Sequence, residues 1–339
     1  MNRRQVVIEA LEFRPPPYVP FDWGMTIDCA KRFREKTGIE DLEPFYAPHF
    51  ASGSASFQTW TEVGPGRFRD AYGVVWDRSV DKDIGTPCEW PIRTPEDLDD
   101  YVWPDAEDPK WYQAAGRWFR QASDRFRVFM IGFSLYERAW TMRGMSELLM
   151  DMVERPEFVD RLLDAITEHD LAQVRNALKL DVDCVYFGDD YGMQTGLIMG
   201  KAYWDRFIKP RLARLFGAVR DAGKYASMHS CGRVTELFDD LTKIGLQLFN
   251  PFQPEVMDVF EVKRRYHGRL AFHGGMSVQK LLPFGTVEEV RERTAKLIEL
   301  GRDGGYVFSP SHSVPRDVPP ENLLAMVEVL KAQPAYDGA

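Results

Sequence analysis

Cysteine, basic runs and long apolar stretches are all scarce in this chain, and each scarcity excludes a class of protein. Only four cysteines occur among its 339 residues, at Cys29, Cys88, Cys184 and Cys231. They are too few and too dispersed for a disulfide framework, so we expect reduced thiols, one of which is available as a metal ligand. No stretch approaches the roughly 20 apolar residues of a membrane span, and the N-terminus lacks the apolar core of a signal peptide. A cytoplasmic protein without a membrane partner is expected.

The charge distribution argues against nucleic acid as a partner. The formal net charge is −9 and no run of lysine or arginine occurs, whereas a nucleic-acid surface needs a concentrated basic patch. Small molecules or proteins are therefore the expected partners. Neither a GxGxxG sequence nor a Walker loop follows any expected strand, which weakens a nucleotide-binding interpretation. The remaining composition, 44% apolar and 28% charged residues, is typical of a globular chain with a sizeable core.

Short apolar runs alternate with helical stretches from about residue 125 onward. Such runs of four to seven residues, separated by helices of ten or more, are typical of βα units that form a parallel sheet. One long helical stretch contains Pro156, which is expected to start its second half. The expected strands lie within residues 127–133, 184–189, 224–230, 246–251, 269–275 and 306–314.

The first 120 residues have weaker periodicity, and we expect them to form an N-terminal elaboration that precedes the regular βα units. They contain a short helix at residues 3–11 and a Pro-bounded apolar segment, YVPFDWG, at residues 18–24. This segment is a plausible first strand. Together with the six later runs it predicts a single α/β domain over residues 1–339, a closed (β/α)8 TIM barrel. Residues 1–120 would form an N-terminal helical and loop elaboration with the first strand, and residues 121–339 the main βα units.

Polar side chains gather where the expected strands end, which is where barrel enzymes carry their chemistry. These strand ends would bring the polar groups to one rim. The residues concerned are Ser134, Tyr136, Glu137, Arg138, Asp189, Asp190, His229, Cys231, Asn250, Gln253, His273 and His312.

The sequence MHSCGRV at residues 228–234 contains the strongest metal-binding candidate. His229 and Cys231 are two apart at a strand end, so both side chains fall on the same face. Imidazole and thiolate suit Zn²⁺, whose catalytic sites use three protein ligands and keep one position open. A strand histidine beside a small buried thiol is the ordinary alternative. His312 is the leading third ligand, with Glu137 or an aspartate of the 189–190 pair as a fourth or alternate.

Each candidate also has a structural interpretation. Asp189 and Asp190 could form a solvated loop pair or cap a helix, Glu137 and Arg138 could form a rim ion pair, and His273 could pack where the backbone turns. Cys231 could instead be a nucleophile with His229 as its base, but no orienting Asn or Asp is identifiable from the sequence. Surface or hydrogen-bonded core positions are expected for the other histidines, His49, His169 and His267.

Three segments resemble the uroporphyrinogen decarboxylase superfamily. They are GDDYGMQTGLIMGKAYWDRFIKPRL, HSCGRV and GGYVFSPSHSVPRDVPPENLLAM, with AYGVVWDR as a weaker N-terminal match. The resemblance covers most of the chain and implies a (β/α)8 barrel. True decarboxylases carry an arginine-rich RQAGRY-type segment that grips substrate carboxylates, whereas this chain has YVPFDWGMTIDCAKRF there.

The resemblance is greater to the cobalamin-dependent methyltransferase branch of this superfamily, in which a His-x-Cys pair and a later cysteine bind zinc. His229 and Cys231 match that pair, and His312 stands in place of the later cysteine. This departure leaves two alternatives, a zinc site with two histidines and one cysteine or a two-ligand remnant without a metal, and we favour the zinc site because Zn²⁺ accepts imidazole in place of thiolate. The resemblance implies a zinc-containing methyltransferase that moves a methyl group between methylcobalamin, carried on a separate corrinoid protein, and a small-molecule donor or acceptor. A monomer or homodimer is implied.

Roles for the remaining residues follow from this hypothesis. Glu137, Asp190 and Tyr136 are catalytic candidates, which would hold the substrate, transfer a proton or wall the pocket. The substrate-binding candidates are Arg138, Asp189, Asn250, Gln253 and His273. Two alternatives stay open: a metal-free decarboxylase or lyase that uses Asp190 and His312, and a non-catalytic member that binds a corrinoid protein or a small ligand.

Overall fold

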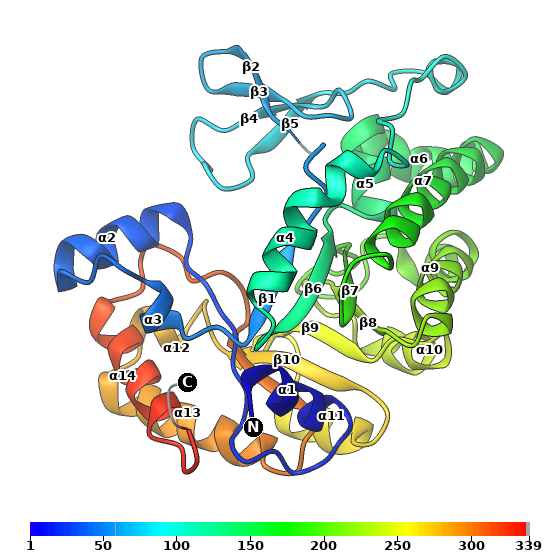
Figure 1. The fold of residues 1–339 in the computed structure, drawn as a ribbon. Helices are drawn as coiled ribbons and strands as arrows, with labels where there is room; N and C mark the ends of the chain where they lie inside the picture. Colours follow the sequence, from blue (N-terminus) through cyan, green and yellow to red (C-terminus); the bar gives the residue numbers. More distant parts are fainter. Residues whose placement is uncertain (58, 337–339) are drawn as a thin grey trace.

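A curled parallel sheet of seven strands forms the centre of the protein (Figure 1). The computed structural model describes residues 1–57 and 59–336. The six runs expected from residue 125 onward are all confirmed as strands of this sheet. In their order across the sheet, the strands are β1 (Phe50–Gly53), β6 (Phe126–Ile131), β7 (Cys184–Gly188), β8 (Tyr225–His229), β9 (Leu248–Phe252), β10 (Ala271–Met276) and β11 (Tyr306–Pro310).

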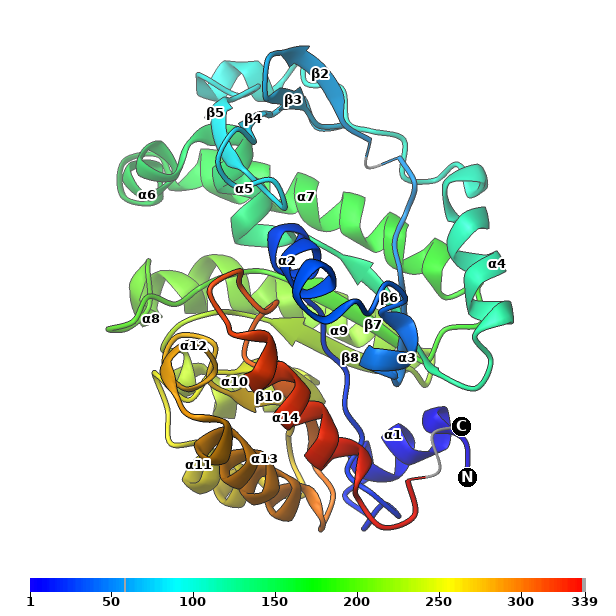
Figure 2. The same cartoon turned by 90° about the vertical axis from the view of Figure 1, so that its left-hand side faces the viewer.

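Helices pack on the outer face of the curled sheet (Figures 1 and 2). The predicted helix at residues 3–11 is confirmed, and Pro156 does begin a new helix, as predicted. The α-helices are α1 (Arg3–Leu11), α2 (Ile27–Thr37), α3 (Glu43–Tyr46), α4 (Gln113–Gln121), α5 (Leu135–Arg143), α6 (Met145–Glu154), α7 (Pro156–Ala177), α8 (Gly200–Tyr203), α9 (Lys209–Asp221), α10 (Phe238–Lys243), α11 (Val259–Tyr266), α12 (Leu281–Phe284), α13 (Val287–Gly301) and α14 (Pro320–Lys331). No helix among the described residues is long and apolar enough to cross a membrane.

The predicted first strand at residues 18–24 is wrong. This segment meets the sheet through an isolated bridge from Phe21 to Phe308 of β11 rather than through a regular ladder. Met25, just after the segment, forms a second isolated bridge to Val314, beyond the end of β11. Pro20 lies within the segment and has no backbone N–H to donate, which limits strand pairing. The described residues therefore contain a seven-stranded curled sheet with a bridging segment beside β11, not a regular eight-stranded barrel.

Two elements of the N-terminal elaboration were not predicted. Strand β1 has the sequence FASG, whose small residues carry little strand signal. A second, antiparallel sheet contains β2 (Thr61–Gly64), β3 (Arg67–Arg69), β4 (Val75–Asp77) and β5 (Thr86–Glu89). Strands of three or four residues are too short to show alternation. This small sheet lies apart from the parallel sheet, beyond α5 (Figure 2).

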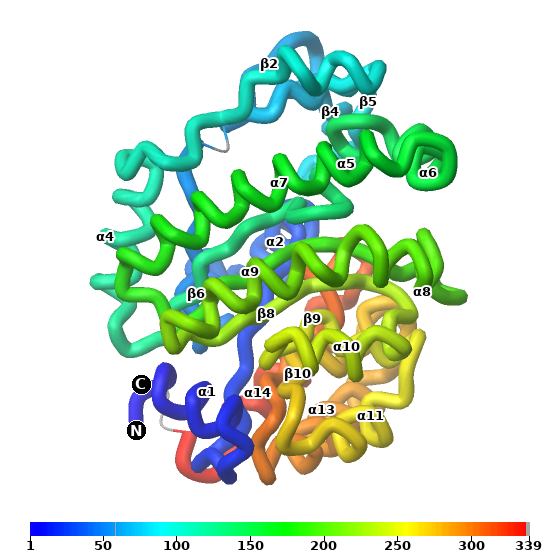
Figure 3. The backbone as a smooth tube through the Cα atoms, turned by 90° about the vertical axis from the view of Figure 1, so that its right-hand side faces the viewer, coloured from blue at the N-terminus to red at the C-terminus, as the bar shows by residue number. Residues whose placement is uncertain are grey.

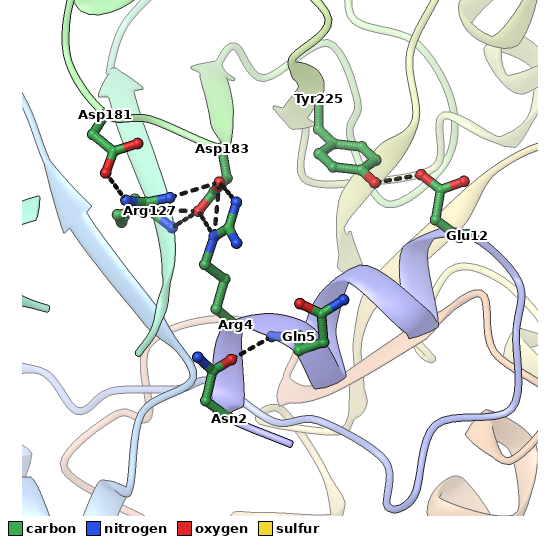
Figure 4. Close-up of polar contacts among 8 residues, drawn as sticks. All are labelled: Asn2, Arg4, Gln5, Glu12, Arg127, Asp181, Asp183 and Tyr225. Atoms are coloured by element: carbon green, nitrogen blue, oxygen red, sulfur yellow. Dashed lines mark hydrogen bonds and ion pairs between the residues drawn. The ribbon is translucent and has the colours of Figure 1, made fainter. Parts of the chain in front are cut away.

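Helix α1 covers the amino ends of the parallel strands (Figure 3). Its Val7 and Leu11 belong to an apolar cluster with residues of β6, including Phe126 and Val128. Beside this cluster, the Asp183 carboxylate accepts hydrogen bonds from Arg4 (2.8 Å) and from Nε of Arg127 (3.0 Å), as Figure 4 shows. These contacts close the amino end of the sheet and leave the carboxyl ends of the strands for a cavity.

Candidate metal centre

A cavity of about 470 Å³ lies inside the curl of the parallel sheet, toward the carboxyl ends of its strands. Strand residues that point inward form its wall, and polar residues of the following loops form its mouth. Because side chains alternate along a strand, residues two apart line the same cavity. The wall includes Phe50, Ser52, Val128, Met130, Cys184, Tyr186, Ser227, His229, Leu248 and Asn250.

His229 is the last residue of β8 and is held by Asn250 of the adjacent β9. Its Nδ1 lies 2.6 Å from Oδ1 of Asn250. The Asn250 amide is itself oriented, because its Nδ2 donates to the backbone carbonyl of His273 at 3.1 Å. An acceptor at Nδ1 places the ring proton there, so Nε2 of His229 carries a free lone pair.

The backbone of the loop after β8 positions Cys231. Its N–H donates to Oδ1 of Asp190 at 2.7 Å. The next residue, Gly232, has φ +84°, and a Cβ there would lie 2.3 Å from the carbonyl carbon of Gly192. The HSCG sequence therefore needs glycine in its last place, since a side chain would push the loop off the segment that carries Asp190.

The structure brings the three predicted metal ligands together. Nε2 of His229 lies 3.2 Å from Sγ of Cys231. His312, on the loop after β11, completes a group whose ligand atoms all lie within 4.8 Å of one another. Tetrahedral zinc with ordinary Zn–N and Zn–S bonds needs N to S separations of about 3.5 Å. The donor set and the tautomer of His229 fit such an ion.

Carboxylates surround this centre. Glu137, at the start of α5, and Asp190, after β7, both line the cavity. Burial, followed by the charges of Asp190 and Asp189, raises the pKa of Glu137 well above its usual value. Burial, followed by the charges of Asp190 and Glu137, raises the pKa of the Cys231 thiol. A bound cation would reverse this effect, because it stabilises the thiolate directly.

These surroundings weigh against the metal-free nucleophile. The orienting residue that the sequence did not reveal is Asn250, which completes a Cys231–His229–Asn250 arrangement. Reactive cysteines, however, lie in electropositive surroundings that lower the thiol pKa, whereas Asp190 and Glu137 raise it here. The geometry suits a nucleophile, but the electrostatics suit a cation ligand.

Five predicted site residues do not line this cavity: Cys231 and Gln253 line a smaller hollow beside it, and Tyr136, Arg138 and Asp189 line neither. The carboxylate of Asp189 accepts hydrogen bonds from the backbone N–H groups of Tyr136 (3.0 Å) and Glu137 (2.7 Å). Asp189 therefore caps α5, which is the helix-capping role that was the alternative to a functional one. Arg138 turns away toward the ring of Tyr72, 3.6 Å from its centroid. Tyr136 is fully buried. These residues surround the start of α5, which carries Glu137.

The other candidates lie beside the metal centre. Asn250 and His273 both line the main cavity. Gln253 lines a smaller hollow of about 280 Å³, together with Cys231 and His312, and accepts from the N–H of Gly232 at 3.1 Å. Burial lowers the pKa of His273 to about 4, so its ring is neutral near pH 7.

Sequence analysis missed several residues of the cavity. Asp22 and Trp23 come from the bridging segment at residues 20–25, and Ile84 comes from the loop between β4 and β5. FDWG follows a Pro-bounded apolar run, and a polar residue after such a run is the signal that could have indicated Asp22. Nothing in the sequence indicated Ile84, because its loop belongs to the small sheet that was not predicted.

The remaining histidines lie away from the metal centre, as predicted. His49 is buried, and its Nε2 lies 3.0 Å from the Tyr18 hydroxyl. Nε2 of His169 lies 3.0 Å from the carbonyl oxygen of Pro104. His267 lies near the surface beside Asp303.

The fold and the cavity define a barrel-like α/β protein whose polar residues gather at the carboxyl ends of parallel strands. Residues 77–333 match the family model of uroporphyrinogen decarboxylase (URO-D), and the chain belongs to this family. It is 24% identical to the uroporphyrinogen decarboxylase of Anaeromyxobacter sp. (strain Fw109-5), over 74% of this chain and 72% of the relative. It is also 24% identical to that of Nitrosomonas europaea, over 74% and 71% of the two chains.

A solved structure has a similar fold over nearly the whole chain. It is a methyltransferase from Methanosarcina mazei, with a TM-score of 0.73 and 15% sequence identity, and the match covers 98% of each chain. At this identity the likeness concerns the fold. It extends over the first 76 residues as well, which lie outside the family match.

Proposed function

We propose that this protein is a zinc-dependent methyltransferase that moves a methyl group between a corrinoid protein and a small-molecule substrate. The observation that carries the proposal is the convergence of His229, Cys231 and His312 beside a cavity. Three nitrogen and sulfur ligands with space for a substrate are the usual composition of a catalytic zinc site. The fold shared with a methyltransferase supports the same assignment.

The protein supplies the ligands and keeps them oriented. Asn250 holds His229 with Nε2 toward Cys231, and Asp190 holds the backbone of Cys231. Zinc in this place would lower the pKa of a substrate thiol, or polarise the leaving atom of an ether or amine. Glu137 and Asp190, both at the cavity wall, are placed to accept or return the substrate proton.

With a methyl-corrinoid protein as the second substrate, the bonds, electrons and proton of the reaction are all accounted for. For a thiol acceptor, the thiol proton passes to a carboxylate and a carbon–sulfur bond forms as the cobalt–carbon bond breaks. Both electrons of the broken bond stay with cobalt, which leaves as Co(I). For a methyl donor the same steps run in reverse, and the carboxylic acid returns a proton to the demethylated atom.

Elemental analysis of protein purified without chelator tests this proposal. We expect about one zinc ion per chain in the wild type and its loss in Cys231→Ala. Cys88→Ala is the matched control, because Cys88 belongs to the small antiparallel sheet and should leave zinc unchanged. Transfer from methylcobalamin to candidate thiols should then follow the zinc content.

Absence of zinc in the wild type, or zinc retained in Cys231→Ala, would contradict the assignment of this centre. Zinc with no transfer to or from any corrinoid would contradict the reaction but not the metal site.

A metal-free decarboxylase is the second candidate, since the curated relatives carry that name and Asp190 and His312 both line the cavity. Among the described residues, however, no lysine or arginine lines it, and Asp22 and Trp23 come from the segment where decarboxylases carry arginines. A substrate with several carboxylates would find no counter-charge. Turnover of such a substrate by zinc-free protein would favour this candidate.

A further inference from the structure

Apart from three histidines, the side chains of the cavity lining that ordinarily carry charge at pH 7 are all carboxylic acids. Asp22, Glu137 and Asp190 belong to its lining, and none of the described residues that line it is a lysine or an arginine. The three lining histidines supply no fixed cation, because two of them are metal-ligand candidates and burial lowers the pKa of His273 to about 4. Burial raises the pKa of Asp22 to about 7 and that of Glu137 well above its usual value. The cavity therefore offers an anionic substrate carboxyl groups, in part ionised, and no lysine or arginine of the described lining to pair with.

Three arginines of the elements that surround the cavity are engaged elsewhere. Arg138 follows Glu137 directly, but its Nη1 atom lies 3.4 Å from Asp70 and its guanidinium lies over Tyr72. Arg4 and Arg127 pair with Asp183 at the opposite end of the strands. These arginines are held against carboxylates outside the cavity, so they are not available to an anionic substrate in it.

The rest of the wall is apolar. Phe50, Val128 and Leu248 form the lower part, Met130 and Tyr186 lie above them, and Trp23 contributes from the bridging segment. Contact with such surfaces favours the apolar body of a ligand. Aromatic faces also tolerate a cationic group better than an anionic one.

We propose that this cavity selects substrates without an anionic group: uncharged or cationic small molecules whose apolar body packs on the strands and whose sulfur, oxygen or nitrogen atom reaches the metal centre. The identity of the reacting atom rests on the proposed function, whereas the charge selection follows from the cavity wall. Thiols, ethers or amines that carry a carboxylate, sulfonate or phosphate are excluded by this selection.

Two thiols of similar size test the proposal, 2-mercaptoethanol and 3-mercaptopropionate. Cobalt(II) replaces zinc in the purified protein, and binding of each thiol is followed by the sulfur-to-cobalt charge-transfer band. We expect the anionic thiol to bind on the order of tenfold more weakly than the neutral one. The ratio of the two affinities is then compared between variants, since the intrinsic acidity of each thiol cancels in that comparison.

The decisive variant is Ser52→Lys, which adds one cation to the cavity wall at an exposed position of β1. It should reduce the preference for the neutral thiol on the order of tenfold. Ser54→Lys is the control, because Ser54 is exposed two residues further on and does not belong to the lining. If Ser52→Lys does not fold, Ile84→Lys places the cation at another lining residue, with the exposed Val80→Lys as its control.

Each outcome decides one question. Equal or tighter binding of 3-mercaptopropionate to the wild type, or an unchanged ratio in Ser52→Lys and Ile84→Lys, would overturn the charge selection and leave the methyltransferase proposal standing. No charge-transfer band with either thiol in metal-loaded protein would overturn thiol activation, and the inference about thiol substrates with it.

Discussion

His229 Nδ1 lies 2.6 Å from Oδ1 of Asn250, across two adjacent parallel strands. The contact exists because the register of the sheet pairs these two residues, His229 of β8 with Asn250 of β9. It determines which nitrogen of His229 is free for the proposed metal. Residues that orient metal ligands contribute strongly to affinity, although they never touch the ion.

Replacement of Asn250 should therefore weaken metal binding. We expect Asn250→Ala to lower zinc affinity about 10- to 100-fold, because the His229 ring loses the acceptor that fixes its tautomer. Asn250→Asp keeps an acceptor at the same place and should retain affinity. Competition with a chromogenic chelator measures both variants. Unchanged affinity in Asn250→Ala would show that Asn250 does not orient the ligand.

Glu137 should act on the reaction rather than on the metal. Glu137→Gln keeps the size of the side chain but removes the carboxyl group that can exchange a proton. We expect kcat/KM for methyl transfer to fall roughly 100-fold or more, with zinc content and fold unchanged. Glu147→Gln, on the exposed part of α6, is the control. A change of less than about threefold would remove Glu137 from proton transfer.

The Asp183 cluster should carry much of the stability of the amino end of the sheet. Asp183→Asn leaves the buried guanidinium of Arg127 without its main partner, and we expect a loss of roughly 3 kcal/mol in the free energy of unfolding. Asp99→Asn removes the exposed partner of Arg161 and should cost less than about 1 kcal/mol. Urea unfolding at pH 7 measures both.

The stabilising effect of Asp183 should also depend on pH. Burial alone would raise its pKa, but hydrogen bonds from Arg4 and Arg127 outweigh burial and hold the pKa below the usual value. Its contribution is therefore present above about pH 4 and is lost as the pH falls through the folded-state pKa. The difference between wild type and Asp183→Asn should narrow in acid. A constant difference from pH 6 to pH 3 would contradict this linkage.

Asp170 should have the opposite pH dependence. It is buried on α7, and burial raises its pKa to about 7, although Ser134 donates to it at 2.8 Å. A carboxyl group whose pKa is raised in the folded state stabilises the fold most below about pH 4, where the group is protonated in both states. This contribution is lost as the pH rises toward 7. Asp170→Asn should therefore flatten the decline of unfolding free energy between pH 4 and pH 8. An unchanged slope in urea titrations would show that Asp170 ionises normally.

Much of the candidate site could be predicted from local sequence because its residues follow strands that carry strong apolar runs. His229 and Cys231 were identified as a pair by the two-residue period of a strand, and Glu137, Asp190 and Asn250 by their places after such runs. Asp189 and Arg138 look like equivalent candidates in the sequence. Only their contacts in the structure show that they face away from the cavity. Asp189 binds the start of α5, and Arg138 contacts Asp70 and Tyr72.

The sequence by itself determined the alternation of strands and helices after residue 125 and the placement of polar residues at strand ends, because both depend on local periodicity. Tertiary structure alone decided that His312 lies beside His229, that Asn250 orients that histidine, and that Asp22 and Ile84 enter the cavity. It also decided that seven regular strands form the sheet while residues 20–25 only bridge to it. These features depend on sheet register and on contacts between segments far apart in the chain, which no local pattern encodes.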